Sequence, residues 1–189
     1  MLKYSDLKKG ENFIFKGQPY EVLDFQQVHR GRGLATVKIK IRNLISGEIL
    51  EKTCHPSEEF EEADIEEVPI KFLYSHRGKF GFCQVDNPKN HFKLTENIIG
   101  EKSLFLKPGQ ILTGLKFQGK IINIKLPVKV ELKIIDTPPS LKGERAQSKT
   151  KIAVLETGLK IEVPSFLKVG DVIQVNTETK EYVKRINKE

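Results

Sequence analysis

Apolar and polar residues alternate with a period of two along most of the chain. In the segment 37–42, valine and isoleucine alternate with three basic residues, Lys38, Lys40 and Arg42. The segment 128–134 shows the same alternation between apolar and charged residues. Because successive side chains of a strand point to opposite faces of a sheet, both segments are predicted to be half-buried antiparallel strands.

Similar short segments recur along the chain and are separated by glycine-containing turns. Strands are predicted at 12–16, 20–25, 48–54, 70–75, 80–85, 111–117, 121–126, 152–156, 159–163, 172–176 and 181–185. Turns are predicted at Lys16-Gly17, Ser46-Gly47, Arg77-Gly78, Gln118-Gly119, Thr157-Gly158 and Val169-Gly170. A single turn of helix is expected at 95–100. Short strands at this spacing are typical of barrels and sandwiches, so the predicted fold class is all-β.

Two changes in composition divide the chain into three pieces. The first is the acidic run 58–64, which has few apolar residues and is interpreted as a charged linker; the second is Leu126-Pro127. The predicted domains are therefore 1–64, 65–127 and 128–189. A piece of about sixty residues can fold as a small barrel, although with marginal stability.

The charge balance favours a polyanionic partner. The 189 residues include 32 Lys and Arg against 25 Asp and Glu, a formal net charge of +7, and the piece 65–127 has the largest excess, with 10 basic and 5 acidic residues. Lysine and arginine bind phosphates with release of counterions. No apolar run approaches the length of a membrane span, and the chain start lacks the apolar core of a signal peptide. We expect a cytoplasmic protein that does not bind membranes.

One basic tip stands out between two predicted strands. The residues are His29, Arg30, Gly31, Arg32 and Gly33, and their position predicts an exposed hairpin tip. The two glycines leave the backbone free to adopt positive φ and give Arg32 little steric cover. A guanidinium group there suits a phosphate or the face of a base. A solubilising turn that carries arginine by chance is the alternative reading of the composition.

A long polar loop is predicted at 137–151, between two clear strands. Loops of this length without their own structure are often functional. Its candidate RNA-binding residues are Lys142, Gly143, Glu144, Arg145, Lys149 and Lys151. The basic strand face formed by Lys38, Lys40 and Arg42 is a further candidate, because such faces follow nucleic-acid backbones. For both the loop and the face, a solvated surface without function is the alternative.

The sequence does not show the arrangements of residues that enzymatic chemistry requires. Cys54 and His55 are neighbours, but on a strand they point to opposite faces and cannot pair as nucleophile and base. The four histidines lack the spacing of metal ligands, and the two cysteines do not form a metal motif. No glycine motif that cradles phosphate is present. We therefore predict no catalytic residue, no metal and no cofactor.

Several stretches have a distinctive spacing. In the C-terminal piece they are Ile134-Ile135-Asp136-Thr137-x-Pro139-x-Leu141-Lys142-Gly143, then Leu155-x-Thr157-Gly158, then Val163-Pro164-x-Phe166, then Gly170-Asp171-x-Ile173-x-Val175-x-Thr177, and finally Glu181-Tyr182-Val183. In the N-terminal piece, Gly17-x-Pro19-Tyr20-x-Val22 precedes the tip. In these residues the chain resembles the elongation factor P family along its whole length.

The resemblance implies a fold and a function. The fold would be three small β-barrel domains in an L shape, an N-terminal KOW/SH3-like barrel followed by two OB-fold barrels. The function would be binding to the 70S ribosome between the P and E sites, beside a stalled peptidyl-tRNA, and relief of stalling at consecutive prolines. Ribosomal RNA would remain the catalyst, and the factor would position the tRNA.

The tip arginine departs from many members of that family. Arg32 falls where many of them carry a modified lysine, and arginine has no primary ε-amine for that chemistry. Some members carry a tip arginine that is glycosylated with rhamnose, which requires an arginine-modifying enzyme, and others use a bare arginine. The resemblance leaves both possibilities open for Arg32.

A second departure lies in the long loop. Many members have Gly-Asp-Thr there, associated with the mRNA codon in the E site, whereas this chain has Gly143-Glu144-Arg145. Arg145 replaces a hydroxyl group with a large cation, so the codon contacts are expected to differ. Two alternatives stay open: an elongation factor P-like paralog with a different range of stalled substrates, and a general RNA-binding β-barrel protein. A monomer is expected in each case.

Overall fold

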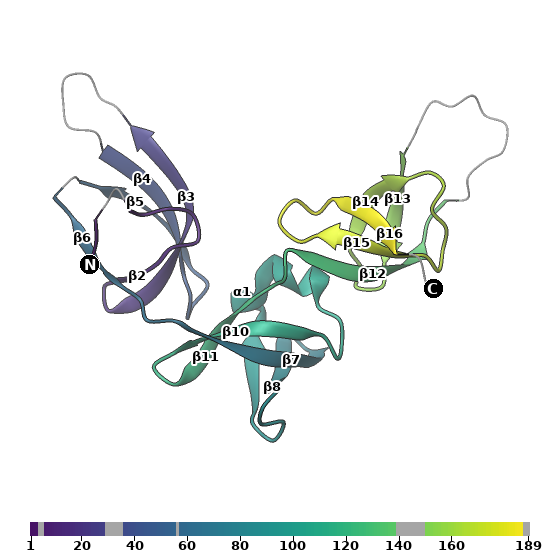
Figure 1. Ribbon diagram of the computed structural model, residues 1–189, viewed down its shortest axis with the longest axis horizontal. Helices are drawn as coiled ribbons and strands as arrows, with labels where there is room; N and C mark the ends of the chain where they lie inside the picture. Colours follow the sequence, from purple (N-terminus) through teal and green to yellow (C-terminus); the bar gives the residue numbers. More distant parts are fainter. Residues whose placement is uncertain (4–5, 29–35, 56, 139–149, 187–189) are drawn as a thin grey trace.

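The structure is a computed structural model that describes residues 1–3, 6–28, 36–55, 57–138 and 150–186. These residues form almost only β-strands, as the alternation predicted, and the strands form three sheets (Figure 1). The first sheet, here called the N-terminal lobe, has the strand order β1-β6-β2-β3-β4-β5. Its strands are β1 (Leu2–Lys3), β2 (Asn12–Phe15), β3 (Gln18–Val28), β4 (Thr36–Asn43), β5 (Ile49–Cys54) and β6 (Glu59–Glu62).

The second and third sheets share one topology. The central lobe comprises β7 (Glu66–His76), β8 (Lys79–Gln84), β9 (His91–Thr95), α1 (Glu96–Ile99), the 3-10 helix η1 (Gly100–Phe105), β10 (Ile111–Phe117) and β11 (Lys120–Lys125). The C-terminal lobe comprises β12 (Lys129–Asp136), β13 (Thr150–Leu155), β14 (Lys160–Pro164), β15 (Val172–Asn176) and β16 (Tyr182–Ile186). The orders are β11-β10-β7-β8-β9 and β14-β13-β12-β15-β16. When the strands of each lobe are numbered from its own start and the second order is read from its other edge, both are 5-4-1-2-3. The expected helical turn at 95–100 is confirmed by α1.

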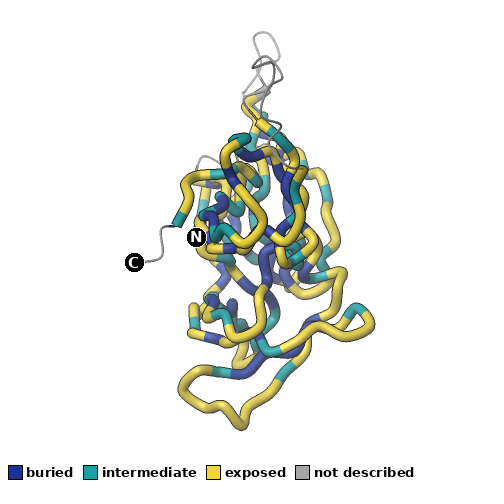
Figure 2. Tube along the Cα trace, turned by 90° about the vertical axis from the view of Figure 1, so that its right-hand side faces the viewer, coloured by how far each residue is buried: buried dark blue, intermediate teal, exposed yellow. Residues whose placement is uncertain are grey.

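The central lobe lies between the other two, and the molecule bends there (Figure 1). The first sheet ends at Glu62, the second runs from Glu66 to Lys125, and the third begins at Lys129. Independent folding of the three predicted domains stays a prediction. In Figure 2, buried and exposed positions alternate along the strands, as expected when one face of each sheet covers a core.

Three hairpins use the turn chemistry that the sequence indicated. Each has a two-residue turn in which both residues adopt positive φ, which defines a type I′ turn and matches the twist of antiparallel strands. They are Lys16-Gly17 between β2 and β3 (50° and 75°), Arg77-Gly78 between β7 and β8 (48° and 70°), and Gln118-Gly119 between β10 and β11 (46° and 81°). The strand registers on either side are therefore fixed locally.

The interpretation of the acidic run 58–64 as a charged linker is wrong. Residues Glu59–Glu62 form β6, which pairs with both β1 and β2. The reason is Phe60, which is 6% exposed and packs edge-on against Phe13, with 5.0 Å between the ring centroids. One inward-facing phenylalanine is sufficient to hold a short strand whose other side chains are charged and face the solvent.

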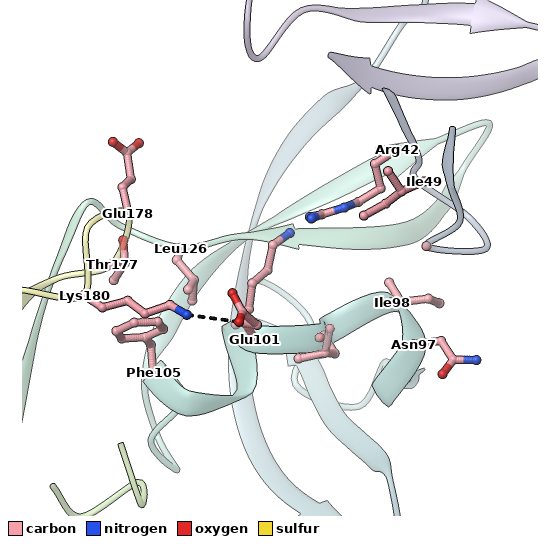
Figure 3. Close-up of a pocket in the computed structure, with 14 residues that line it drawn as sticks. Arg42, Ile49, Asn97, Ile98, Glu101, Phe105, Leu126, Thr177, Glu178 and Lys180 are labelled. Carbon is pink, nitrogen blue, oxygen red and sulfur yellow. Dashed lines mark ion pairs between the residues drawn. The ribbon is translucent and has the colours of Figure 1, made fainter. Parts of the chain in front are cut away.

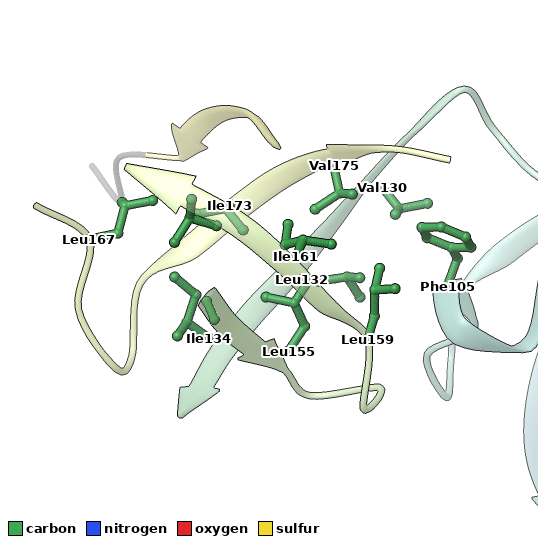
Figure 4. Packing of buried hydrophobic residues seen from close by; sticks show 12 residues of the cluster. Phe105, Val130, Leu132, Ile134, Leu155, Leu159, Ile161, Leu167, Ile173 and Val175 are labelled. Carbon is green, nitrogen blue, oxygen red and sulfur yellow. The ribbon is translucent and has the colours of Figure 1, made fainter. Parts of the chain in front are cut away.

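The C-terminal lobe takes part of its core from the central lobe. Phe105, at the end of η1, is 2% exposed and belongs to the cluster that also contains Val130, Leu159 and Val175 (Figure 4). Leu104 and Leu126 pack against the same cluster from outside the third sheet. The hydrophobic core thus fastens the C-terminal lobe to the central one.

Truncating this shared side chain should destabilise the protein strongly. We expect Phe105→Ala to lower the free energy of unfolding by about 3–5 kcal/mol, because it leaves a cavity between two lobes. The matched control is Phe166→Ala in the C-terminal lobe, where the side chain is 58% exposed and the expected change is within about 0.5 kcal/mol. Urea unfolding of both variants checks this, and equal stabilities would contradict the role of Phe105.

Candidate nucleic-acid interface

The basic strand face lies on the long hairpin of β3 and β4. Along β4, valine and isoleucine at 37, 39 and 41 are buried in the core of the N-terminal lobe. Lys38, Lys40 and Arg42 therefore point to the opposite side, as the alternation predicted. Their contact with RNA stays a prediction.

The neighbouring strands give Lys38 and Lys40 different electrostatic surroundings. Lys40 lies between Asp24 on β3 and Glu51 on β5, so two carboxylates offset its charge. Lys38 lies between two neutral residues, Gln26 and Thr53. A shallow hollow of about 460 Å³ extends over both lysines. Of the two, Lys38 is the cation better placed to hold a phosphate.

Arg42 lies at the end of the same strand face, where the lobes meet. It lines a hollow of about 440 Å³ to which all three lobes contribute (Figure 3). On the far side of this hollow, Lys180 of the C-terminal lobe pairs with Glu101 of the central lobe, with 3.0 Å between Nζ and Oε1. Arg42 shares the strand face of Lys38 and Lys40, as the alternation predicted, and lies at the end of that face, at the junction between the lobes.

A buried amide and a partly buried amine form this junction. Asn123, which is 0% exposed, donates from Nδ2 to the Leu44 carbonyl oxygen of the N-terminal lobe at 3.2 Å. The Lys102 amine donates to Asn123 Oδ1 at 2.9 Å and to the Ile124 carbonyl oxygen at 2.5 Å. Burial lowers the pKa of Lys102 to about 8, against a smaller opposing effect of Glu21 and with a further lowering by Arg42. The only sequence signal for this site was an asparagine within an apolar strand.

The lowered pKa of Lys102 predicts a pH dependence of stability. The amine titrates near 8 in the folded protein and near 10.5 when unfolded, so between these values the unfolded chain binds more protons. The free energy of unfolding contributed by this group therefore rises from pH 8 to pH 10.5. In Lys102→Met this rise should be absent, whereas Lys120→Met, at an exposed position, should keep it. Urea unfolding across this range measures the effect, and parallel curves for Lys102→Met and the parent would contradict it.

The predicted polar loop is closed at its base. The Lys151 amine donates to the Pro138 carbonyl oxygen at 2.8 Å, and the Thr137 hydroxyl donates to the Ile152 carbonyl oxygen at 3.1 Å. Lys151 thus links the two ends of the segment. The other candidate residues lie outside the described residues: Lys142, Gly143, Glu144, Arg145 and Lys149 in this loop, and His29, Arg30, Gly31, Arg32 and Gly33 at the tip.

The strands that flank both candidate segments end far from the central lobe. The last pair of the β3–β4 hairpin is Val28 with Thr36, and this end of the hairpin points away from the centre of the molecule (Figure 1). Strand β12 runs outward from the central lobe, and β13 begins beside its outer end (Figure 1). The strands that flank the two segments thus end on the outer sides of two different lobes.

Comparison with known proteins now decides the family. The family model described as "Elongation factor P (EF-P) KOW-like domain" matches residues 3–60, and "Elongation factor P, C-terminal" matches residues 130–185. Elongation factor P of Desulforapulum autotrophicum is 40% identical over 99% of this chain and 100% of its own. That of Carboxydothermus hydrogenoformans is 37% identical over 98% and 100%. The chain belongs to the elongation factor P family.

Membership of the elongation factor P family makes the protein a translation factor that acts with the ribosome. The KOW-like match covers the N-terminal lobe up to Phe60 in β6, and the second match covers the C-terminal lobe from β12 to β16. Among solved structures, eukaryotic translation initiation factor 5A from Methanococcus jannaschii is 19% identical over 66% of this chain and 92% of its own, with a TM-score of 0.48. This likeness is too loose to add to the family assignment.

Other features of the described residues bear on thiol and metal chemistry. Burial raises the pKa of the Cys54 thiol to about 11, Glu58 adds to the rise, and Lys52 opposes it, so the thiol is protonated near neutral pH. Among the described residues, no group of three or more His, Cys, Asp or Glu residues is placed to hold a metal ion. None of the helices in the described ranges is long and apolar enough to cross a membrane.

Proposed function

We propose that this protein binds the ribosome between the P and E sites and relieves stalling at consecutive prolines by positioning the P-site peptidyl-tRNA. The full-length family match, together with a long hairpin that leads to Arg32, carries the proposal. Proline is a poor nucleophile with an awkward shape, so the main benefit of the factor is orientation of the reacting groups. Ribosomal RNA performs the chemistry, and the protein is not an enzyme.

In this proposal Arg32 approaches the peptidyl-transferase centre and steadies the acceptor end of the tRNA. His29, Arg30, Gly31 and Gly33 give the tip its charge and backbone freedom. Arg32 acts either bare or after rhamnosylation by an arginine-modifying enzyme. The mass of the peptide that contains Arg32, isolated from the native source, distinguishes the two forms.

The other basic residues hold RNA around the tip. Lys38, and less strongly Lys40, bind phosphates along the hairpin, because Lys40 already faces two carboxylates. Residues Lys142 to Lys149 meet the E-site codon of the mRNA, and Arg145 adds a contact to phosphate. Lys151 supports this segment through the Pro138 carbonyl oxygen. Arg42, which lines the hollow between the lobes, extends this RNA-binding face toward the central lobe.

Toeprinting tests the proposal in a purified translation system. A message with consecutive proline codons should give a strong stop at those codons, and adding the protein should remove it. In the cell, the protein would act in the cytoplasm as a monomer. A stop at a rare codon in a message without prolines should persist. Binding to ribosomes without loss of the proline stop would favour a paralog with other substrates. Equal binding to ribosomes and to free RNA of any kind would favour a general RNA-binding protein.

A further inference from the structure

The outer face of the central sheet carries a second concentration of positive charge. Across β7, β8 and β9, the register places nine residues in three rows on the side opposite the core. The middle row is Tyr74, Gly81 and Lys93, and the flanking rows contain Lys71 and Lys79. Three of the nine residues are lysines, two are histidines, and none is acidic. We call this surface the Tyr74 face.

Tyr74 lies on a glycine at the centre of this face. A Cβ atom placed on Gly81 would be 2.7 Å from the Cε1 and Cζ atoms of Tyr74, so only glycine allows the ring to rest there. The tyrosine is nevertheless 44% exposed. One side of the ring is supported by backbone and the remainder is open to the solvent. An aromatic ring held in this way is a rigid platform on which a flat group can stack.

The platform borders a hollow of about 280 Å³. Its lining includes Tyr74, Gly81, His91 and Lys93. This volume lies near the lower end of the range of about 300–1,000 Å³ that is typical of small-ligand sites. A flat ring that enters it would contact the tyrosine and remain within reach of a histidine and a lysine.

The lysines of this face have no fixed counter-charge. Among the described residues, Lys71, Lys79 and Lys93 form no ion pair, whereas the acidic residues of β7 pair with lysines of β10 and β11. An acidic side chain at one end of this face is Glu96, which lies against Gly78 at the turn that closes β7 and β8. Positive charge around an exposed aromatic ring suits a ligand that combines anionic groups with flat rings.

We propose that the Tyr74 face binds single-stranded RNA, with one base stacked on Tyr74 and the adjacent phosphates held by Lys71, Lys79 and Lys93. The face spans strands one to three of a five-stranded OB-type sheet, and strands two and three are where such folds bind oligonucleotides. An acidic protein would satisfy the lysines but would not use the supported ring. This site adds to the proposed function, because it lies on a different lobe from Arg32 and the predicted loop.

Fluorescence anisotropy with the full chain tests the site, using a labelled single-stranded RNA of about twelve nucleotides. Tyr74→Leu keeps an apolar cover over Gly81 but removes the ring, and should weaken binding about tenfold. Tyr74→Phe should bind within about twofold of the parent. An abasic strand of the same length and charge should bind the parent and Tyr74→Leu equally, because it has nothing to stack.

Equal affinity of Tyr74→Leu and the parent for the RNA would overturn the proposal, and so would an equal loss with the abasic strand. Tighter binding to polyglutamate than to RNA would assign the face to an acidic protein. Lys93→Gln should reduce the slope of log affinity against log salt by about one, whereas Lys120→Gln should leave it unchanged. Because these assays use free RNA, their failure would leave relief of proline stalls untouched, and failure of that relief would leave this site untouched.

Discussion

Arg32→Ala should abolish most relief of proline stalls while leaving ribosome binding almost unchanged. One side chain at a tip contributes little to the affinity of a large interface, but it orients the reacting end of the tRNA. Misplacement of a reacting group by about 1 Å can cost about 100-fold in rate. The measurement is the yield of full-length product from a proline-run message, together with co-sedimentation of the variant with ribosomes.

Arg30→Ala is the matched control, because it removes the same charge from the same segment. It should retain most of the relief, since its expected role is limited to attraction of phosphate. If Arg32→Ala relieves stalls as well as the parent, the role assigned to Arg32 is wrong. If both variants lose ribosome binding alike, the tip contributes affinity instead of orientation.

Gly47→Ala should disrupt the contact between the N-terminal and central lobes. Gly47 has φ of +78°, and a Cβ atom there would be 2.3 Å from the Asn97 carbonyl oxygen of α1. This oxygen belongs to the backbone of the other lobe, so neither partner can move without separating the two. The expected loss in the free energy of unfolding is about 3 kcal/mol, of which roughly 1 comes from the left-handed backbone and the rest from the clash.

Gly17→Ala is the control that separates the cost of the backbone conformation from the cost of the clash. Gly17 has nearly the same φ, +75°, but nothing lies within 4 Å of an added Cβ atom. Its expected cost is therefore the backbone term alone, about 1 kcal/mol. Urea unfolding compares the two variants, and small-angle scattering should show a change in shape for Gly47→Ala only. Equal stabilities and equal scattering curves would show that Gly47 does not set the approach of the lobes.

The parts of the fold that depend on local sequence were predictable. The alternation around β4 and the glycine turns at Gly17 and Gly78 are encoded within a few residues, and the structure has both. Strand β6 was missed because its charge obscured Phe60, whose partner Phe13 is distant in sequence. Strand β9 was missed because its alternation, Phe92 and Leu94 among polar residues, spans only five positions, and it pairs with the free edge of β8.

In the candidate site, too, the local features were predictable and the contacts between distant residues were not. The outward direction of Lys38 and Lys40 followed from the pattern of one strand. The carboxylates beside Lys40 belong to two other strands, and their register was not readable from the sequence. The link between Asn123 and the Leu44 carbonyl oxygen joins residues 79 positions apart. Contacts of this kind depend on how the lobes pack, which no local pattern encodes.

The rate of a single peptide bond tests the central claim most directly. Ribosomes that hold a peptidyl-tRNA ending in proline would be mixed rapidly with prolyl-tRNA, with and without the protein, and the product measured over time. The account predicts a faster proline–proline bond and an unchanged phenylalanine–lysine bond on otherwise identical ribosomes. An unchanged proline–proline rate with the protein bound to the ribosome would contradict it.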